Sequence, residues 1–579
     1  MARAQINETV RYEPDENPPL LITIGAGVQS SLSIIGGVVL GVLIVFRIAG
    51  QPEASLEWAV FAALLISGIT TILQAVRVWR IGSGHVLMMG TSGAFIAVCA
   101  AALMQGGPEL MASLVVISSL FQFALAARLS WLRRIFTPVV TGTVIMLIAA
   151  TVMPIFFDML TAVPEHVDVT GAPVVAVIAI MVVVVLILRG PPMLRIWSPL
   201  IGIIAGCVIS VPFGMYDFQY VIDAPWFGIA FRSWPGWEFT PGVEFWALLP
   251  AFVVVTLVGA IETIGDGVAI QRVSRRSPRA TDFRVVQGAL NADGVGNLLS
   301  GLAGTMPNTT YSSSVSLAEV TGIASRRVGV AIGVIFITIA FFPKISALLI
   351  AIPAPVIAGY GAVLITLLFV QGMSIVVRDG LDHRKAVIVG LAFWIGVGFQ
   401  NKVIFPELLG DGFLGVLLGN GMTSGAIVAV ALMAFVEFSR RRSRRLQIAL
   451  NDDTQARIDD FLRATASRAR WNAGATDRLL AVGEETVTIL MQEDDELTSG
   501  QPRRVVLSAR SEGSNIELEF ATALEGENME DKLALLGELP EIPDEKEVSF
   551  RLLRHYASSV RHQKYHGSDI IMVTVSGTV

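Results

Sequence analysis

Cysteine and charge are both scarce in this sequence. Two of its 579 residues are cysteines and 16% are charged, whereas 53% are hydrophobic. Cys99 and Cys207 lie in apolar stretches, where a thiol behaves as a small hydrophobic group, so we expect no disulfide framework. The shortage of charge excludes an ordinary soluble protein. The net charge of −6 combines basic loops in the N-terminal part with an acidic tail, so it does not indicate a nucleic-acid partner.

Long apolar stretches recur through the first 438 residues, and each clear one can cross about 30 Å of hydrocarbon. Three weaker segments, near 84–105, 286–304 and 309–322, are interrupted by Gly, Ser, Thr or Pro in the manner of discontinuous helices. Both kinds together predict an all-α polytopic membrane protein with 14 transmembrane segments. The clear stretches lie near 20–46, 56–79, 110–128, 135–157, 171–189, 196–214, 245–267, 328–350, 354–377, 384–400 and 412–438.

Basic residues gather in alternate loops between these stretches, as the excess of Lys and Arg on the cytoplasmic side predicts. We therefore expect a multi-pass protein of the cell (inner) membrane with both termini in the cytoplasm. The apolar stretch from Pro19 lacks a cleavage pattern, so it is interpreted as a first span rather than a removable signal. The basic loops contain Arg77, Arg80, Arg128, Arg133, Arg134, Arg189, Arg195, Arg272, Arg275, Arg276, Arg279, Arg284, Arg326, Arg327, Arg378, Arg384 and Lys385.

Two carboxylates interrupt the apolar span FWALLPAFVVVTLVGAIETIGDGVAIQ. Glu262 and Asp266 lie one helical turn apart within it. A carboxylate near a bilayer centre costs about 2.5–3.5 kcal/mol on insertion scales, so the pair indicates a hydrated interior site, as in a transporter. An ion pair with a neighbouring helix is the competing interpretation, but the spans offer almost no Lys or Arg.

Two broken segments occupy matching places if the spans divide into seven plus seven. They are VLMMGTSGAF in the third and PNTTYSSSVS in the tenth. Inverted repeats place such segments at the binding site, where the N–H groups of a half-helix point at the midplane. The alternative is that Gly and Ser only permit close helix packing. Pro307 and Asn308 are poor choices for packing, so we favour interrupted helices.

The chain resembles the nucleobase-ascorbate transporters, also called xanthine/uracil permeases, over residues 20 to 438. The matching segments are GSGHVLMMGTSGAF, VVVTLVGAIETIGD and LNADGVGNLLSGLAGTMPNTTYSSSVSLAEVTGIASRR. The resemblance implies a core domain of helices one to four and eight to eleven that moves against a gate domain. It places Glu262 at the substrate-binding glutamate, Asp266 at its polar partner and Asp293 at the aspartate of the ninth helix. Gln29 matches the glutamine of the first helix, but Ser30 stands where histidine is usual.

A neutral nucleobase presents N–H donors beside carbonyl acceptors. Glu262 can accept two N–H bonds, and backbone N–H groups at Gly93, Ser313 and Ser314 could answer the carbonyls. An ionised carboxylate is costly to bury, so Glu262, Asp266 or Asp293 could carry a coupling proton, with Na⁺ as the alternative ion. An interhelical hydrogen bond for Gln29, and a helix N-terminal role for Asp293, are at least as plausible. No cofactor or metal is expected. We expect the helix breaks to depend on Thr91, Ser92, Thr310, Ser316 and Thr321.

The tenth segment departs from the family pattern. Where the family shows Gln, Glu or Pro followed by Asn, with a Gly and a Thr beyond, this chain has Ser313, Ser314, Ser316 and Thr321. A serine cannot make the two-point contact of an amide or carboxylate. A purine such as xanthine or uric acid is the expected substrate. Uracil, a sulfate-permease-type anion and a sensing role are the alternatives.

The tail from Leu446 onward is charged and has no apolar span. Its pattern predicts helices near 452–469, 474–496, 529–537 and 547–561 and strands at 503–509, 515–521 and 569–577. It weakly resembles a histidine-kinase-type ATPase domain that lacks the asparagine and glycine motifs for ATP, so an accessory or dimerisation role is favoured.

In the membrane part, Glu319 and His85 are minor candidates for the site, and His85 is expected at a membrane edge. We expect a homodimer, a cytoplasmic protein partner for the tail and four regions: 1–18, 19–438, 439–445 and 446–579.

Overall fold

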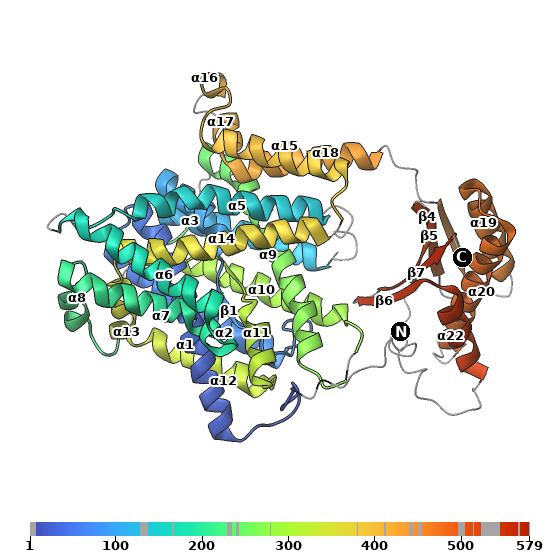
Figure 1. The fold of residues 1–579 in the computed structure, drawn as a ribbon, viewed down its shortest axis with the longest axis horizontal. Coiled ribbons are helices and arrows are strands. Elements are labelled where there is room, and N and C mark those ends of the chain that lie inside the picture. Colours follow the sequence, from blue (N-terminus) through green and yellow to red (C-terminus); the bar gives the residue numbers. More distant parts are fainter. Residues whose placement is uncertain are drawn as a thin grey trace. The chain divides into compact units, whose positions relative to one another are not determined.

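The chain folds into two compact units, a helical unit of Glu8–Arg276 and Val285–Phe438 and a second unit that contains Ser439–Val579. Figure 1 labels their elements. The computed structural model describes residues 7, 9–127, 137–164, 167–228, 234–238, 242–277, 279–378, 380–409, 413–438, 444–449, 454–495, 504–512, 514–522, 545–565 and 568–577. The predicted helix at 529–537 and the arginines 128, 133, 134 and 440–442 lie outside these residues.

The helical unit is built almost wholly from helices, as its apolar stretches predict. Proline occupies the first or second position of α5, α6 and α7, where its missing N–H is harmless, and Asp382 caps α15 by accepting from Lys385 N. The helices are α1 Leu20–Ile48, α2 Glu53–Val76, α3 Ile96–Ala127, α5 Pro138–Met159, α6 Ala172–Arg189, α7 Pro192–Ser210, α8 Phe218–Asp223, α9 Val243–Val273, α10 Phe283–Ala303, α11 Ser313–Thr321, α12 Arg326–Ala340, α13 Pro343–Ile350, α14 Ala354–Arg378, α15 His383–Gln400, α16 Pro406–Leu409, α17 Phe413–Gly419 and α18 Gly421–Phe438.

Seven of the described helices are long and apolar enough to cross a membrane, and the pair α12 and α13 makes an eighth if it is one span. The protein is therefore a multi-pass membrane protein. That pair is bent by 85° just before Pro343, so the stretch near 328–350 that is predicted as one span is divided into two helices. The break predicted within 286–304 is also wrong, because α10 runs through it without interruption.

Helix α3 joins the second half of the predicted third segment to the fourth. Its backbone leaves helical geometry at Gly107, whose φ is 73°, and Pro108 follows. A positive φ is readily adopted by glycine, and proline cannot continue the preceding hydrogen-bond ladder. The sequence therefore sets a sharp turn between two helical halves, as the predicted boundary between 105 and 110 implies.

Three pairs of helices touch through their backbones at facing glycines. A Cβ atom built on either glycine of a pair would lie under 3.0 Å from the carbonyl oxygen of the other, so no larger residue fits without moving the helices. Small residues at such crossings are common where helices pack within a membrane. The pairs are Gly68 with Gly333 (α2 and α12), Gly142 with Gly372 (α5 and α14) and Gly396 with Gly421 (α15 and α18).

Residues 9–16 form a non-helical segment, here called the N-terminal strap, that lies along the ends of α9 and α12. Tyr12 pairs with Ile323 in a parallel bridge. The Arg276 guanidinium donates two bonds of 2.7 Å to the Glu16 carboxylate, and the Arg276 N–H donates to Glu13. The strap therefore joins the loop after α9 to the loop before α12.

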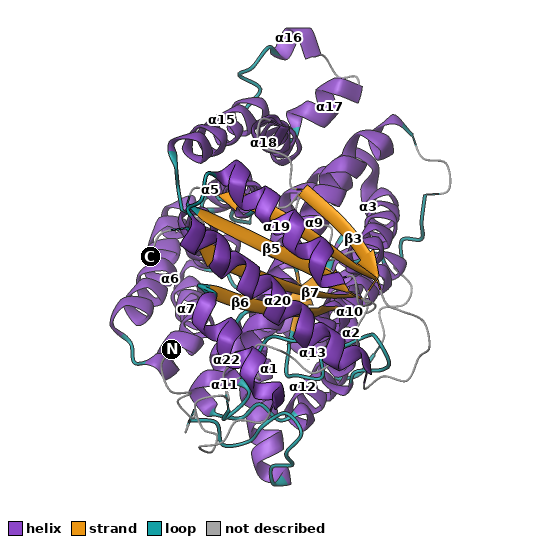
Figure 2. Ribbon diagram, turned by 90° about the vertical axis from the view of Figure 1, so that its right-hand side faces the viewer, coloured by secondary structure: helices purple, strands orange, loops and turns teal. Residues whose placement is uncertain are grey.

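The second unit is a five-stranded antiparallel sheet in the order β3-β4-β5-β7-β6. Along β5, side chains alternate between a buried and a more accessible face, and Leu518 and Phe520 are fully buried. Figure 2 shows helices over one face of the sheet, and the apolar side chains pack between these helices and the sheet. The elements are β3 Arg444–Ala449, α19 Thr454–Ala469, α20 Ala473–Asp495, β4 Arg504–Glu512, β5 Asn515–Thr522, α22 Glu545–Tyr556, β6 Ser559–Tyr565 and β7 Ser568–Ser576.

Two features of this unit differ from the sequence prediction. The unit begins with a strand, β3, where a basic linker followed by a helix is predicted, because Arg444–Ala449 pairs with β4 along its whole length. The helix predicted over 547–561 ends at Tyr556 and gives way to β6, which pairs with β7. The predicted helices α19 and α20 and the strands β5 and β7 are confirmed within two residues at their described ends, and β4 extends three residues beyond its predicted end at 509.

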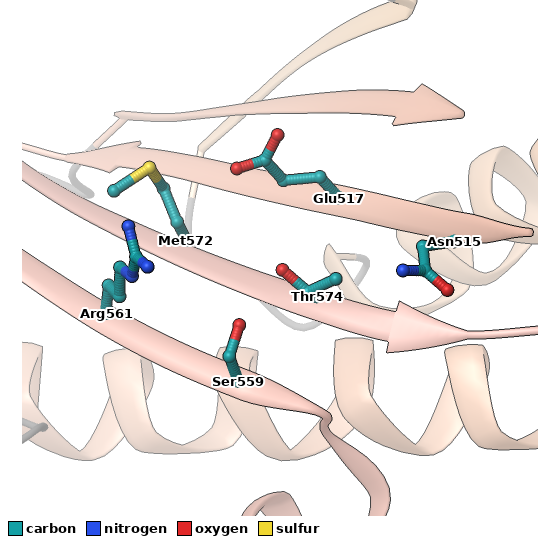
Figure 3. Close-up of a pocket in the computed structure, with 6 residues that line it drawn as sticks. All are labelled: Asn515, Glu517, Ser559, Arg561, Met572 and Thr574. Atoms are coloured by element: carbon teal, nitrogen blue, oxygen red, sulfur yellow. The ribbon is translucent and has the colours of Figure 1, made fainter. Parts of the chain in front are cut away.

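The sheet face away from the helices carries a shallow pocket of about 220 Å³. Figure 3 shows its polar side chains projecting from three neighbouring strands. Glu517 on β5 lies opposite Thr574 on β7, and Thr574 lies opposite Ser559 on β6, so the strand register sets the side chains in a row. Asn515, Arg561 and Met572 complete the lining.

Candidate functional site

Two three-residue strands meet inside the helical unit. β1 (Met89–Thr91) and β2 (Asn308–Thr310) pair antiparallel, with Gly90 opposite Thr309. Each strand precedes a helical segment, η1 (Gly93–Phe95) leading into α3, and α11. Both broken segments are therefore short extended stretches joined to helices, as their Ser, Thr and Gly content predicts. Figure 1 shows β1 and α11 among the surrounding helices.

Hydrogen bonds hold the strands against their neighbours. The Thr91 hydroxyl donates to the α1 carbonyls of Gly37 and Val38, at 3.1 and 2.9 Å. The Tyr311 hydroxyl donates to Thr91 O at 2.9 Å, so its ring crosses the face of β1. The backbone groups of these segments need hydrogen-bond partners, because an unpaired backbone group within a membrane is costly in free energy.

Glu262 lies beside this bonded region and takes no part in its hydrogen bonds. Helix α9, which carries it, packs against η1, β2 and α11. The Glu262 side chain is half-buried, and among the described residues it has neither a hydrogen-bond partner nor an ion pair. Buried or half-buried carboxylates normally have partners. An unpartnered one beside two helix breaks is the feature expected of a group that meets a ligand.

Asp266, one turn along α9, is already engaged. It is buried, and each carboxylate oxygen accepts one hydroxyl bond. Ser312 Oγ lies 2.6 Å from Oδ1, and Thr310 Oγ1 lies 2.7 Å from Oδ2. Both donors lie just before the start of α11. Asp266 therefore fixes the break between β2 and α11, whereas Glu262 leaves its carboxylate open.

Asp293 lies within α10, not at its start, so the helix N-terminal interpretation is wrong. Its Oδ2 atom accepts from Gln122 Nε2 at 2.6 Å and from Thr263 Oγ1 at 2.9 Å. Asn297 donates to Gln122 Oε1 at 2.6 Å and accepts from Asn308 N at 2.7 Å. The buried Oδ1 atom of Asp293 has no partner among the described atoms. A polar network therefore runs through the interior from α3 to β2.

Helix starts contribute backbone donors. A Cβ built at Gly93 meets no atom within 4 Å, so the backbone of η1 borders open space there. At α11 the Ser313 N–H has no acceptor among the described residues, as is usual in a first helical turn. Ser314 differs from its prediction. Its N–H and hydroxyl both donate to Tyr311 O, and its hydroxyl accepts from Met88 N, so it joins the two broken segments instead.

The remaining predicted residues are dispersed. Ser92 is buried, Thr321 donates to Leu317 O, and Ser316 and Glu319 are exposed on α11. Gln29 is half-buried on α1 and has an interaction partner. His85 is 4% exposed in the loop before β1, and its Nδ1 lies 3.1 Å from Ser83 O.

Sequence reasoning missed several contributors. Gln122 is a lone amide in an apolar span, a signal that could have revealed it. Thr263 and Ser312 adjoin predicted residues but resemble ordinary small polar residues. Tyr311 lies within the broken segment itself. Their roles depend on contacts between residues far apart in the chain, such as the 171 positions between Gln122 and Asp293.

The geometry of this site agrees with the similarity of the sequence to known permeases. A family model described as the permease family, for xanthine and uracil permeases, matches residues 21–403. The chain belongs to this family. The resemblance proposed from its motifs is confirmed, and the protein is a permease rather than an enzyme.

Three permeases are similar to this chain over about three quarters of its length. It is 30% identical over 445 residues to a Clostridium perfringens protein named as a purine permease, covering 74% of this chain and 93% of that protein. It is 28% identical to the xanthine permease XanP of Escherichia coli, covering 75% and 95%. It is 27% identical to the uric acid permease PucJ of Bacillus subtilis, covering 72% and 93%. The family match ends at residue 403, before the second unit begins.

Proposed function

We propose that this permease is a symporter for a nucleobase, a purine such as xanthine or uric acid, with uracil as the next choice. The observation that carries the proposal is the half-buried, unpartnered carboxylate of Glu262 between two broken segments. The names of its relatives, which include xanthine, uric acid and purine permeases, support the same substrate class.

Each group in the site has a role that matches an edge of a base. The Glu262 carboxylate accepts N–H donors from the ring, and charge-assisted bonds of this kind are the strong ones in a low-dielectric pocket. The N–H groups of Gly93 and Ser313 donate to ring carbonyls. Ser313 has only a hydroxyl to add, so recognition on that side depends on the backbone.

Transport would proceed by alternating access. The broken segments would occupy equivalent places in two inverted repeats of seven spans, and the core helices would carry the site against a gate that includes α5 and α14. The protein would be a homodimer in the inner membrane. Both termini of each chain would lie in the cytoplasm. The second unit would bind a cytoplasmic protein partner.

Coupling is assigned to a proton. Glu262, Asp266 and Asp293 lie within one region of the helical unit, and the described residues form no ion pair with any of them. Three neighbouring carboxylates without a counter-charge cannot all be ionised cheaply, so protonation of at least one accompanies the cycle. Sodium is the alternative coupling ion.

Glu262→Gln tests the site. The amide keeps the shape but offers one acceptor and adds a donor, so binding of radiolabelled xanthine to purified protein should fall by about tenfold or more. Glu319→Gln, on the exposed side of α11, is the matched control and should bind as the wild type does. If Glu262→Gln binds xanthine, uric acid and uracil unchanged while folded, the proposed site is wrong. Binding without uptake in vesicles would indicate a sensor.

A further inference from the structure

A continuous chain of hydrogen bonds connects Asp266 with Asp293 through two threonine hydroxyls. Thr310 Oγ1 lies 2.7 Å from Asp266 Oδ2 and 3.3 Å from Thr263 Oγ1. Thr263 Oγ1 lies 2.9 Å from Asp293 Oδ2. None of the four side chains is more than 5% exposed, so bulk water does not reach these oxygens in this conformation. The chain runs from the break before α11 into the interior of α10.

The number of available protons determines whether every link of this hydrogen-bond chain can form. It has four oxygen atoms and three links, and each link needs one proton between its two oxygens. The two threonines supply one hydroxyl proton each. With both aspartates ionised, one link would place two lone pairs against each other. With one aspartate protonated, all three links are satisfied. The arrangement is therefore complete when the two aspartates share a single proton.

Two such states exist, and they differ only in direction. In one state Asp266 holds the proton and donates to Thr310, which donates to Thr263, which donates to ionised Asp293. In the other state Asp293 holds the proton and every bond is reversed. We propose that Thr263 and Thr310 form a proton relay between Asp266 and Asp293. This inference rests on the proposed proton-coupled transport.

The transfer step balances without any further reactant. The O–H bond of Asp266 breaks as a new O–H bond forms on Thr310. Thr310 passes its original proton to Thr263, and Thr263 passes its own to Asp293 Oδ2. One proton moves, both threonines end neutral, and the negative charge passes from Asp293 to Asp266. The 3.3 Å link between the hydroxyls is the longest, so closing it is the step that conformational change can control.

The surroundings select the oxygens at each end. Gln122 Nε2 donates to Asp293 Oδ2 in either state, while Ser312 Oγ donates to Asp266 Oδ1 and leaves Oδ2 for the relay. The titratable groups nearest to the relay are Glu262 on its own helix, Asp266 and Asp293. The described residues of α3 and β2 that contact it, Gln122 and Thr310, are uncharged.

Because Ser312 and Thr310 both donate to Asp266, the state of this carboxyl also affects the broken segment. An ionised Asp266 accepts two hydroxyl bonds and holds the start of α11 firmly. A protonated Asp266 must turn one of these bonds around, since its Oδ2 atom then donates to Thr310. The relay therefore links the position of one proton to the geometry of the segment that carries Ser313.

Threonine-to-valine substitutions test the relay, because valine keeps the shape and removes the hydroxyl. In proteoliposomes, Thr263→Val and Thr310→Val should lower xanthine uptake driven by a pH gradient by about tenfold or more. In Thr263→Val, which leaves both hydroxyl bonds to Asp266 in place, xanthine exchange needs no net proton movement and should stay within about twofold of the wild type. Thr263→Ser and Thr310→Ser, which keep the hydroxyl, should restore gradient-driven uptake. Equal loss of exchange and uptake in Thr263→Val, or no loss of uptake in either valine variant, would overturn the relay.

A second measurement does not depend on any substrate. Infrared difference spectra between acid and alkaline pH, recorded on the purified full chain, report protonated carboxyl groups. The two aspartates share one proton in the relay. Asp266→Asn and Asp293→Asn, each introduced alone into the wild-type protein, should therefore change the same carboxyl band. With Thr263→Val present, the two aspartates should give separate bands. Separate bands already present in the wild type would refute the relay, whereas failure of xanthine to bind would count only against the proposed function.

Discussion

Ser312 Oγ donates a 2.6 Å hydrogen bond to Asp266 Oδ1 and thereby attaches the residue before α11 to the middle of α9. Ser312→Ala should destabilise the protein by about 1–3 kcal/mol, because a buried carboxylate oxygen loses its donor. Xanthine affinity should fall with it, since the start of α11 is no longer fixed. Thermal unfolding with and without xanthine measures both effects. Ser316→Ala, an exposed position on the same helix, should change neither.

A methyl group at Gly90 should disturb the strand pair. A Cβ there would lie 2.6 Å from the Tyr311 ring, whose hydroxyl is held by Thr91 O. Gly90→Ala should therefore cost about 1–3 kcal/mol of stability, the usual penalty for overpacking, as measured by unfolding temperature. Gly265→Ala is the matched control, because a Cβ at Gly265 meets no atom within 4 Å and alanine favours a helix. A folded, equally stable Gly90→Ala variant would contradict this packing.

The N-terminal strap should loosen in acid. The Arg276 guanidinium, followed by the Glu13 N–H, holds the pKa of Glu16 below its usual value. A carboxyl with a lowered folded-state pKa stabilises the fold above its unfolded pKa of about 4.3, and this contribution disappears as pH falls through the lowered value. Between about pH 6 and pH 8, well above the lowered pKa of Glu16, the stability of the strap should not change with pH.

Hydrogen exchange of the Arg11 and Tyr12 amides, which donate to Gly322 O, reports the strap directly. Glu16→Gln should speed their exchange at neutral pH by about two- to tenfold. Glu319→Gln serves as the control for loss of an acidic side chain elsewhere. Slow exchange that persists in Glu16→Gln would show that backbone pairing alone holds the strap.

Removing residues 439–579 should leave the helical unit able to bind xanthine. Each unit has its own cluster of buried apolar residues, with Phe252 in the first and Phe520 in the second. The family match also ends within the helical unit. Binding of radiolabelled xanthine to the shortened protein should stay within about twofold of that of the full chain. Loss of folding on removal would show that the second unit is structural.

Sequence alone anticipated most of the helices and the two breaks, for physical reasons that are local. Apolar length identifies a span, and the Pro, Asn and Thr residues at the start of PNTTYSSSVS interrupt a helix before α11 begins. The partners of the carboxylates were not predictable in this way. Asp266 bonds to residues 44 and 46 positions later, and only the fold brings them together.

The strand β3 shows the same limit in the second unit. Its sequence, RRLQIA, follows an arginine run and looks like a basic linker. It becomes a strand because β4 supplies an edge along all six residues. The 85° bend before Pro343 also escaped prediction, since apolar composition is the same on both sides of it.

The facing glycines join pairs of helices in the helical unit through direct backbone contact. Where Gly68 meets Gly333, or Gly142 meets Gly372, the helices touch through backbone and have no side-chain rotamers with which to adapt. We therefore expect the two helices of such a pair to move together. Rearrangement during transport must therefore be taken up at helix boundaries lined by longer side chains, and the glycine joints decide which helices travel together.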